Sequence, residues 1–129
     1  MALRAGAARW TSGEVRRSRG AGPRRYPRSV PNFGVTLVHA RNWDNQRSIR
    51  DQERWAEHAT FMDGLVDDGL IVVGGPLGSG ERTLHLVDAP DEQTVKSRLR
   101  SDPWAQMGLL EIGTITEWAF WLDGRNAAG

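Results

Sequence analysis

The sequence has 129 residues, the size of one domain, and it contains no cysteine, which excludes disulfides and thiolate chemistry. Its apolar runs, such as residues 70–73, are far shorter than a membrane-spanning helix needs, so we expect a cytoplasmic protein with no membrane partner. The net charge of +1 divides unevenly: residues 1–31 hold eight arginines and one acid, whereas residues 32–129 hold nine basic and fifteen acidic residues. Because phosphate contacts need Lys and Arg, this acidic part predicts no nucleic-acid partner.

Residues 1–31 are rich in Arg, Gly, Ala and Pro and show no apolar periodicity, which predicts a disordered basic N-terminal extension. We expect this extension to be non-functional and to precede a true start near Val30. An organellar transit peptide and a basic arm that contacts nucleic acid or membrane are alternative interpretations. The folded domain is predicted over residues 32–123, followed by a short C-terminal tail over residues 124–129.

The first predicted elements are a strand and a helix. Residues 33–40 are largely apolar on both alternating rows, which predicts a central strand covered on both faces. The helix is predicted from Ile49 or Asp51 to Asp67, and Gly69 supplies the left-handed residue that ends it.

A hairpin is predicted next. Residues 70–74 form a short continuous apolar strand, and Gly75 and Pro76 are predicted to turn the chain out of it. Residues 78–80 then make the hairpin connection. The alternating pattern of residues 82–87 predicts the third strand.

The last predicted elements complete a β-α-β-β-α-β order. A second helix starts near residues 88–91, where Pro90 and the acids suit a first turn, and residues 109–122 form a long final strand. This order predicts an α+β, ferredoxin-like fold with two helices on one face of a four-stranded antiparallel sheet. The other face of the sheet is then apolar and bare, so we expect a homodimer in which a second copy covers it.

The predicted first helix carries a histidine at the edge of its apolar face. The face is formed by Trp55, Ala59, Met62, Leu65 and Val66. The ring of His58 is therefore directed toward the sheet, and its burial costs free energy unless it finds a hydrogen-bond partner. One interpretation is a core histidine satisfied by a backbone carbonyl, and the other is a functional histidine paired with a carboxylate.

Asp102 is the candidate partner, although it also has a structural interpretation. It directly precedes Pro103 and a short turn that ends at Gly108, which is typical of a helix N-cap. The two roles are compatible only if one carboxylate oxygen caps the turn while the other faces His58. A paired carboxylate would fix the tautomer of the imidazole and leave its other nitrogen for proton transfer.

Several short features also occur together in a definite order. They are His58, the following Gly69, the Gly74-Gly75-Pro76 turn, and Asp102-Pro103-Trp104 with Gly108 after it. With these features, residues 33–121 resemble the YCII-related (YciI-like) domain family. The resemblance implies a ferredoxin-like fold that dimerises into an α+β barrel, and a His–Asp dyad in a pocket, which maps onto His58 and Asp102. Most members have no established reaction, and a few are lyases acting on chlorinated hydroxyquinol-type aromatics.

We therefore expect an enzyme that uses His58 and Asp102 for general acid–base chemistry, of lyase, isomerase or hydrolase type, on a small metabolite of anionic or aromatic character. No recognisable motif supplies a nucleophile, so the expected step is proton transfer without a covalent enzyme intermediate. A non-catalytic ligand-binding or accessory protein of the same fold is one alternative. A cofactor-free monooxygenase of the wider dimeric-barrel group is another.

Four residues are candidates for substrate binding, each with a structural alternative. Arg54 would orient an anionic substrate, or would be a solvated or salt-bridged helix residue. Gly75 and Pro76 would let a substrate approach the backbone, or would simply form a turn. Trp104 would wall the pocket or pack in the core. The three histidines lack metal-ligand spacing, so we expect neither a metal nor another cofactor.

Overall fold

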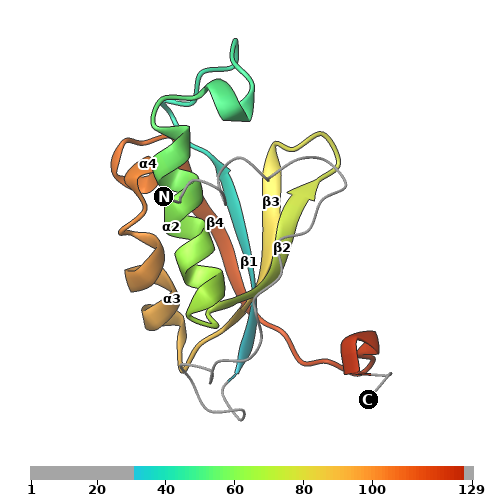
Figure 1. Ribbon diagram of the computed structural model, residues 1–129. Helices are drawn as coiled ribbons and strands as arrows, with labels where there is room; N and C mark the ends of the chain where they lie inside the picture. The colour runs from blue at the N-terminus through green and yellow to red at the C-terminus, as the bar shows by residue number, and fades with distance from the viewer. Residues whose placement is uncertain (1–30, 127–129) are drawn as a thin grey trace.

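The computed structural model describes residues 31–126, which form a four-stranded antiparallel sheet with helices on one face (Figure 1). The strands are β1 (Asn32–His39), β2 (Ile71–Leu77), β3 (Arg82–Asp88) and β4 (Leu110–Glu117). Their order across the sheet is β2-β3-β1-β4, so β1 lies in the interior, as predicted. Together with the helix positions, this order confirms the ferredoxin-like α+β plan.

Three helices, α2 (Trp55–Asp67), α3 (Glu92–Leu99) and the short α4 (Pro103–Gln106), lie against that face. Their ends follow local sequence signals. α2 ends as predicted, because Gly69 adopts a φ of 86°, which is left-handed and favours glycine. α3 begins after Asp91, whose carboxylate accepts a hydrogen bond from the backbone N–H of Thr94 at 2.8 Å. Pro90 therefore lies before the cap and not in the first turn.

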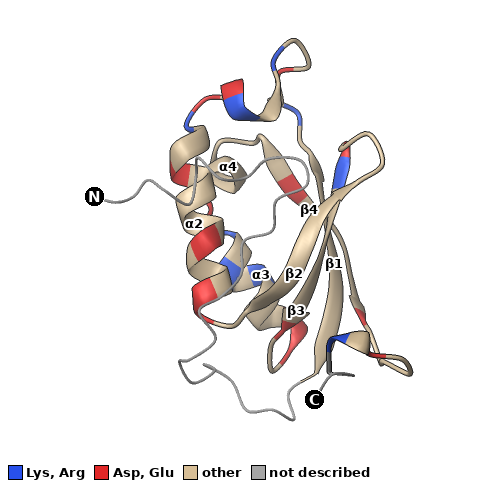
Figure 2. Ribbon diagram, turned by 45° about the vertical axis from the view of Figure 1, so that its right-hand side comes forward, with Lys and Arg blue, Asp and Glu red and all other residues tan. Residues whose placement is uncertain are grey.

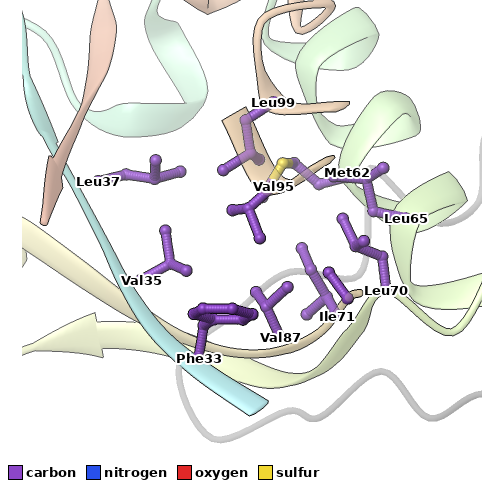
Figure 3. Packing of buried hydrophobic residues seen from close by; sticks show 11 residues of the cluster. Phe33, Val35, Leu37, Met62, Leu65, Leu70, Ile71, Val87, Val95 and Leu99 are labelled. Atoms are coloured by element: carbon purple, nitrogen blue, oxygen red, sulfur yellow. The ribbon is translucent and has the colours of Figure 1, made fainter. Parts of the chain in front are cut away.

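The core lies between the sheet and the helices (Figure 3). Alternate residues of β1 point into it because side chains of a strand alternate between faces. The labelled core residues are Phe33, Val35, Leu37, Met62, Leu65, Leu70, Ile71, Val87, Val95 and Leu99. Burying each large apolar side chain contributes about 1.5–3 kcal/mol, so α2 is held firmly on the sheet by the same face that carries His58.

The predicted turn at Gly75 and Pro76 is wrong. β2 continues through both residues to Leu77, and the turn follows at Gly78 and Gly80, whose φ values are +55° and +95°. The strand tolerates Pro76 because β2 is an edge strand, where a missing backbone N–H need not cost a ladder hydrogen bond.

The predicted start of the first helix is also wrong. A short 3₁₀ helix, η1 (Ile49–Asp51), comes first, and α2 begins only at Trp55. Between them Arg54 has a φ of 61°, which interrupts the helical path. The preceding loop is held by the buried Gln52, whose amide donates to the carbonyl of Asp44 at 2.7 Å.

The final strand is shorter than predicted because β1, the strand with which β4 pairs, begins at Asn32. Glu117 pairs with Phe33, near the start of β1, and the last backbone contact is the N–H of Trp118 with the carbonyl of Asn32 at 2.8 Å. Beyond this point the chain leaves the sheet (Figure 1), and Trp121 is 94% exposed.

The helix-free face of the sheet is largely uncharged. Figure 2 shows Lys, Arg, Asp and Glu mainly on helices and loops and few on the strands. Val73, Leu84 and Leu86 lie on this face. Leu84 and Leu86 alternate along β3 with residues that face the helices, and Val73 of β2 pairs with Leu86. Val73 is half exposed.

The predicted domain boundaries fall near the limits of the described residues and stay a prediction. The extension over residues 1–31 lies outside the described residues except for Pro31, and the tail over residues 124–129 is described only as the short 3₁₀ helix η2 (Gly124–Asn126). Within residues 31–126, no helix is long and apolar enough to cross a membrane.

Candidate functional site

His58 of α2 and Asp102 at the start of α4 form a buried pair. Nδ1 of His58 lies 2.8 Å from Oδ2 and 3.0 Å from Oδ1 of Asp102, and each residue is only 3% exposed. Because an ionised carboxylate only accepts hydrogen bonds, Nδ1 carries the hydrogen and donates it. The contact therefore sets the tautomer of the neutral His58 ring, with the hydrogen on Nδ1 and the lone pair on Nε2.

Asp102 is at the same time the N-cap of α4. Its Oδ1 accepts a hydrogen bond from the backbone N–H of Trp104 at 3.0 Å, and Pro103 occupies the first helical position, where no backbone N–H is needed. Asp102 thus caps α4 and contacts His58 at once: Oδ1 accepts from the backbone of Trp104 and also lies near Nδ1, while Oδ2 is the oxygen closer to Nδ1. Whether the pair is catalytic stays a prediction.

Trp104 fixes the plane of the imidazole. Its ring stacks on that of His58 with 3.9 Å between centroids and 5° between planes. Trp104 is fully buried, and its indole Nε1–H donates to the carbonyl of Glu53 at 2.7 Å. The stacking fixes the ring plane and Asp102 fixes its rotation, so the direction of Nε2 is determined by the fold.

The stacked pair belongs to a longer row of aromatic rings. Trp43 meets Trp104 edge-on at 5.6 Å, and His39 at the end of β1 stacks on Trp43 at 3.8 Å. Burial lowers the pKa of His39, while the carboxylate of Glu81 acts in the opposite direction. No sequence signal connects these rings, because they come from segments that meet only in the tertiary structure.

A cavity of about 230 Å³ borders Asp102 between the helices and β4. Its apolar lining consists of Leu37, Leu99, Ala105, Leu110 and Ile112, and exposed Arg100 and Glu111 add one charge of each sign. A concave, mostly apolar space with a few polar groups is typical of small-molecule sites. The sequence did not single out Arg100, because the cavity that it lines is formed only when this segment packs beside β1 and β4.

The YCII-related domain family matches residues 35–119, a range that contains both members of the buried pair. The chain belongs to the YCII-related domain family. The resemblance seen in the sequence is thereby confirmed. No curated protein and no solved structure matches the chain.

In this YCII-related domain the predicted substrate-binding residues are dispersed. Trp104 stacks on His58, whereas exposed Arg54 forms an ion pair with Glu57. Gly75 lies on the helix-free face, and Pro76 lies on the helix side but is exposed. Their roles in binding stay predictions. Among residues 31–126, no group of three His, Asp or Glu side chains is arranged to hold a metal ion.

His85 of β3 is a titratable group near the pair that the sequence did not single out. Burial lowers its pKa from the ordinary 6.5 to about 4, and positive charge on His58 acts in the same direction. Between these two pH values the unfolded chain binds a proton at His85 that the folded domain does not. The free energy of unfolding therefore falls as the pH falls from 6.5 to 4.

This shift predicts a measurable pH dependence. In urea titrations at several pH values, His85→Gln is expected to remove a loss of about 3 kcal/mol that the wild type suffers between pH 6.5 and 4. Because the carboxylates titrate in both proteins, the difference between their free energies of unfolding reports on His85. Parallel stability curves for the two proteins would show that His85 is not held neutral.

Proposed function

We propose that this YCII-related domain is an enzyme that uses His58 and Asp102 for general acid–base chemistry on a small molecule. The observation that carries the proposal is the buried contact of Nδ1 of His58 with both oxygens of Asp102. A core histidine needs only one acceptor such as a backbone carbonyl, whereas a carboxylate partner also stabilises the imidazolium that forms during proton transfer.

The proton would pass through Nε2 of His58. In one direction Nε2 takes a proton from the substrate, and the negative charge of Asp102 stabilises the resulting imidazolium without itself accepting the proton. In the other direction the imidazolium returns the proton to a leaving group or to another atom of the substrate. In a lyase, removal of a substrate proton is followed by departure of a leaving group, and in an isomerase the proton returns to another atom of the substrate. In a hydrolase, Nε2 takes the proton from an attacking water and returns it to the leaving group as the bond to that group breaks.

The cavity beside Asp102 supports a substrate with a small apolar body. Five of its lining side chains are apolar, and a volume of about 230 Å³ suits a molecule of the size of one aromatic ring with substituents. Arg100 would favour a carboxylate or another anionic group on that ring, because a guanidinium binds planar anions well. Small aromatic acids are therefore the substrate class to test first.

The test is a thermal-shift screen of small aromatic and aliphatic acids and phenols. A ligand at 100 times its Kd adds about 2.7 kcal/mol to stability and raises Tm. We expect a hit in the wild type that is lost in His58→Gln and is chemically converted by the wild type on incubation. His39→Gln is the matched control, because His39 is an imidazole of the same aromatic row whose ring contact is with Trp43.

A ligand-binding or accessory protein is the second candidate. It is favoured by the capping role of Asp102 and the stacking of Trp104, which give the buried pair a structural purpose of its own. A ligand that binds equally to the wild type and to His58→Gln and is never converted would support this candidate against the enzyme.

We also propose that a second copy covers the helix-free face of the sheet. Val73 on this face is 51% exposed and lies beside other apolar residues, and such patches are rarely left bare. Light scattering should give a mass near that of two 14.3 kDa chains, which Val73→Glu reduces to one. Ile49→Glu is the matched control, since Ile49 is 45% exposed in η1. A wild-type monomer would contradict the proposal.

A further inference from the structure

His85 points to the same side of the sheet as His58. It pairs with Val35, which is fully buried beneath the helices, and residues directly opposite in neighbouring strands share a face. On its other side His85 pairs with Gly74 of the edge strand β2. The imidazole of β3 therefore lies in the layer between the sheet and α2, where His58 is located.

The ring of His85 occupies the space into which a side chain at position 74 would extend, and residue 74 is a glycine. A Cβ atom added to Gly74 would lie 2.3 Å from Nδ1 of His85, so any residue larger than glycine has to displace the ring. Gly74 itself has an ordinary strand conformation, and its φ is not among the positive values of the chain. The glycine is therefore required here for space and not for backbone freedom.

The two ring nitrogens of His85 differ in their surroundings. Nε2 lies 2.9 Å from the hydroxyl oxygen of Thr83, whereas Nδ1 is buried and no described residue offers it a hydrogen bond. A buried N–H without an acceptor loses the hydrogen bond that it makes with water, so Nδ1 is better suited to a lone pair than to a hydrogen. The hydrogen of the neutral ring therefore belongs on Nε2, where it donates to Thr83.

The charge on His58 acts on His85 from across the layer. Positive charge on His58 lowers the pKa of His85, because two positive charges repel each other. The strand partners of His85, Val35 of β1 and Gly74 of β2, and its hydrogen-bond partner Thr83 carry no charge. His58 in turn is faced by Asp102 and by the rings of Trp55 and Trp104.

We propose that His85 is a positioning residue of the site, held as a neutral Nε2–H imidazole by Gly74 and Thr83, so that His58 alone of the two histidines takes up a proton. Like charges at close range disfavour each other, so a protonated His85 would oppose the imidazolium on His58. Asp102 favours the charged form of one ring while Gly74 prevents it on the other. The consequence for catalysis rests on the proposed acid–base function, but the state of the two rings does not.

The experiment is NMR of the imidazole nitrogens as a function of pH, in the wild type and in Gly74→Ala. In the wild type His85 should show a hydrogen on Nε2, a bare Nδ1 and no protonation until the pH approaches 4. In Gly74→Ala the displaced ring should titrate closer to 6.5, and its two tautomers should mix because the ring is moved away from the hydroxyl of Thr83. Gly75→Ala is the matched control, because its added Cβ meets nothing within 4 Å, and it should leave the tautomer and the titration of His85 unchanged.

Two results would overturn the proposal. One is a wild-type His85 with its hydrogen on Nδ1. The other is a Gly74→Ala protein in which His85 still shows a single tautomer and no protonation until the pH approaches 4. Thr83→Val serves if Gly74→Ala does not fold, because it removes the hydrogen-bond acceptor at nearly constant volume, and it should mix the two tautomers of His85.

The same titrations keep this proposal separate from the proposed function, since they need no substrate. If the two rings behave as expected and no ligand is found, the proposal about His85 is supported and the proposed enzymatic function is not. If a substrate is converted, the pH profile of kcat should move to lower pH in Gly74→Ala and stay in place in Gly75→Ala. A pH profile of kcat that is the same in the wild type and in Gly74→Ala, although the titration of His85 has moved, counts against the positioning role.

Discussion

Asp102→Ala is expected to lower the free energy of unfolding by about 3 kcal/mol, which combines a lost helix cap of about 1 kcal/mol with a lost buried hydrogen bond to a charged group. The substitution removes the acceptor of the Trp104 N–H and the partner of His58 at once. Because both groups are buried, water cannot replace the lost contacts at low cost. Urea denaturation at pH 7, extrapolated to water, measures the loss.

Asp102→Asn is the matched variant that separates the two functions of this carboxylate. The amide oxygen can still accept from the backbone N–H of Trp104 and from Nδ1–H of His58, so most of the stability should remain. The negative charge that stabilises an imidazolium is gone, so acid–base activity should fall while the fold survives. Equal destabilisation by both substitutions would mean that charge, and not capping geometry, holds α4 in place.

Trp104→Ala is expected to have the larger effect, a loss of about 4 kcal/mol, because it empties the space of a fully buried indole. The variant also loses the hydrogen bond to the carbonyl of Glu53 and the ring that stacks on His58. Thermal and urea unfolding should both show the loss, and the nitrogen signals of His58 should report a ring that is no longer held in one plane.

The matched control for Trp104→Ala is Trp121→Ala. It removes the same indole from a side chain that is 94% exposed in a single copy, so its effect on the stability of the monomer should be within about 0.5 kcal/mol. A large loss for Trp121→Ala would show that the C-terminal segment is covered in solution, which would support the proposed contact between two copies.

These expectations affect how activity data for this YCII-related domain are to be interpreted. Asp102 and Trp104 each hold the fold and touch His58, so loss of activity in their alanine variants does not by itself identify a catalytic role. His58→Gln and Asp102→Asn preserve more of the packing. They are therefore the variants in which chemistry and stability can be separated.

Much of the fold could be predicted because its signals are local. The alternation of β1, the apolar face of α2 and the glycine that ends α2 each depend on neighbouring residues in the chain. Errors arose where an element's extent depends on a partner strand. β4 stops at Glu117 because β1 has no further residue to pair with, and β2 passes through Pro76 because it lies at the edge of the sheet.

The candidate site could be predicted in part for the same reason. Asp102 before Pro103 is a local N-cap signal, and the position of His58 on the helix face follows from helical periodicity. Their pairing was expected from the family resemblance and from chemistry, since a buried histidine needs a partner. A pocket and a place for Trp104 beside it were expected, but the stacking of Trp104 on His58, the aromatic row to His39 and the residues that line the cavity were not, because each joins segments that are far apart in the chain.

The sequence by itself therefore determined which residues are candidates for chemistry and where several helices and strands begin or end, since those properties follow from periodicity, caps and turns. The tertiary structure alone decided the surroundings of each group. It placed Asp102 against both His58 and the backbone of Trp104, stacked the indole of Trp104 on His58, and placed the ring of His85 next to Gly74. Such contacts join residues of different helices and strands, as the separation of 44 residues between His58 and Asp102 shows, and local interactions alone do not specify them.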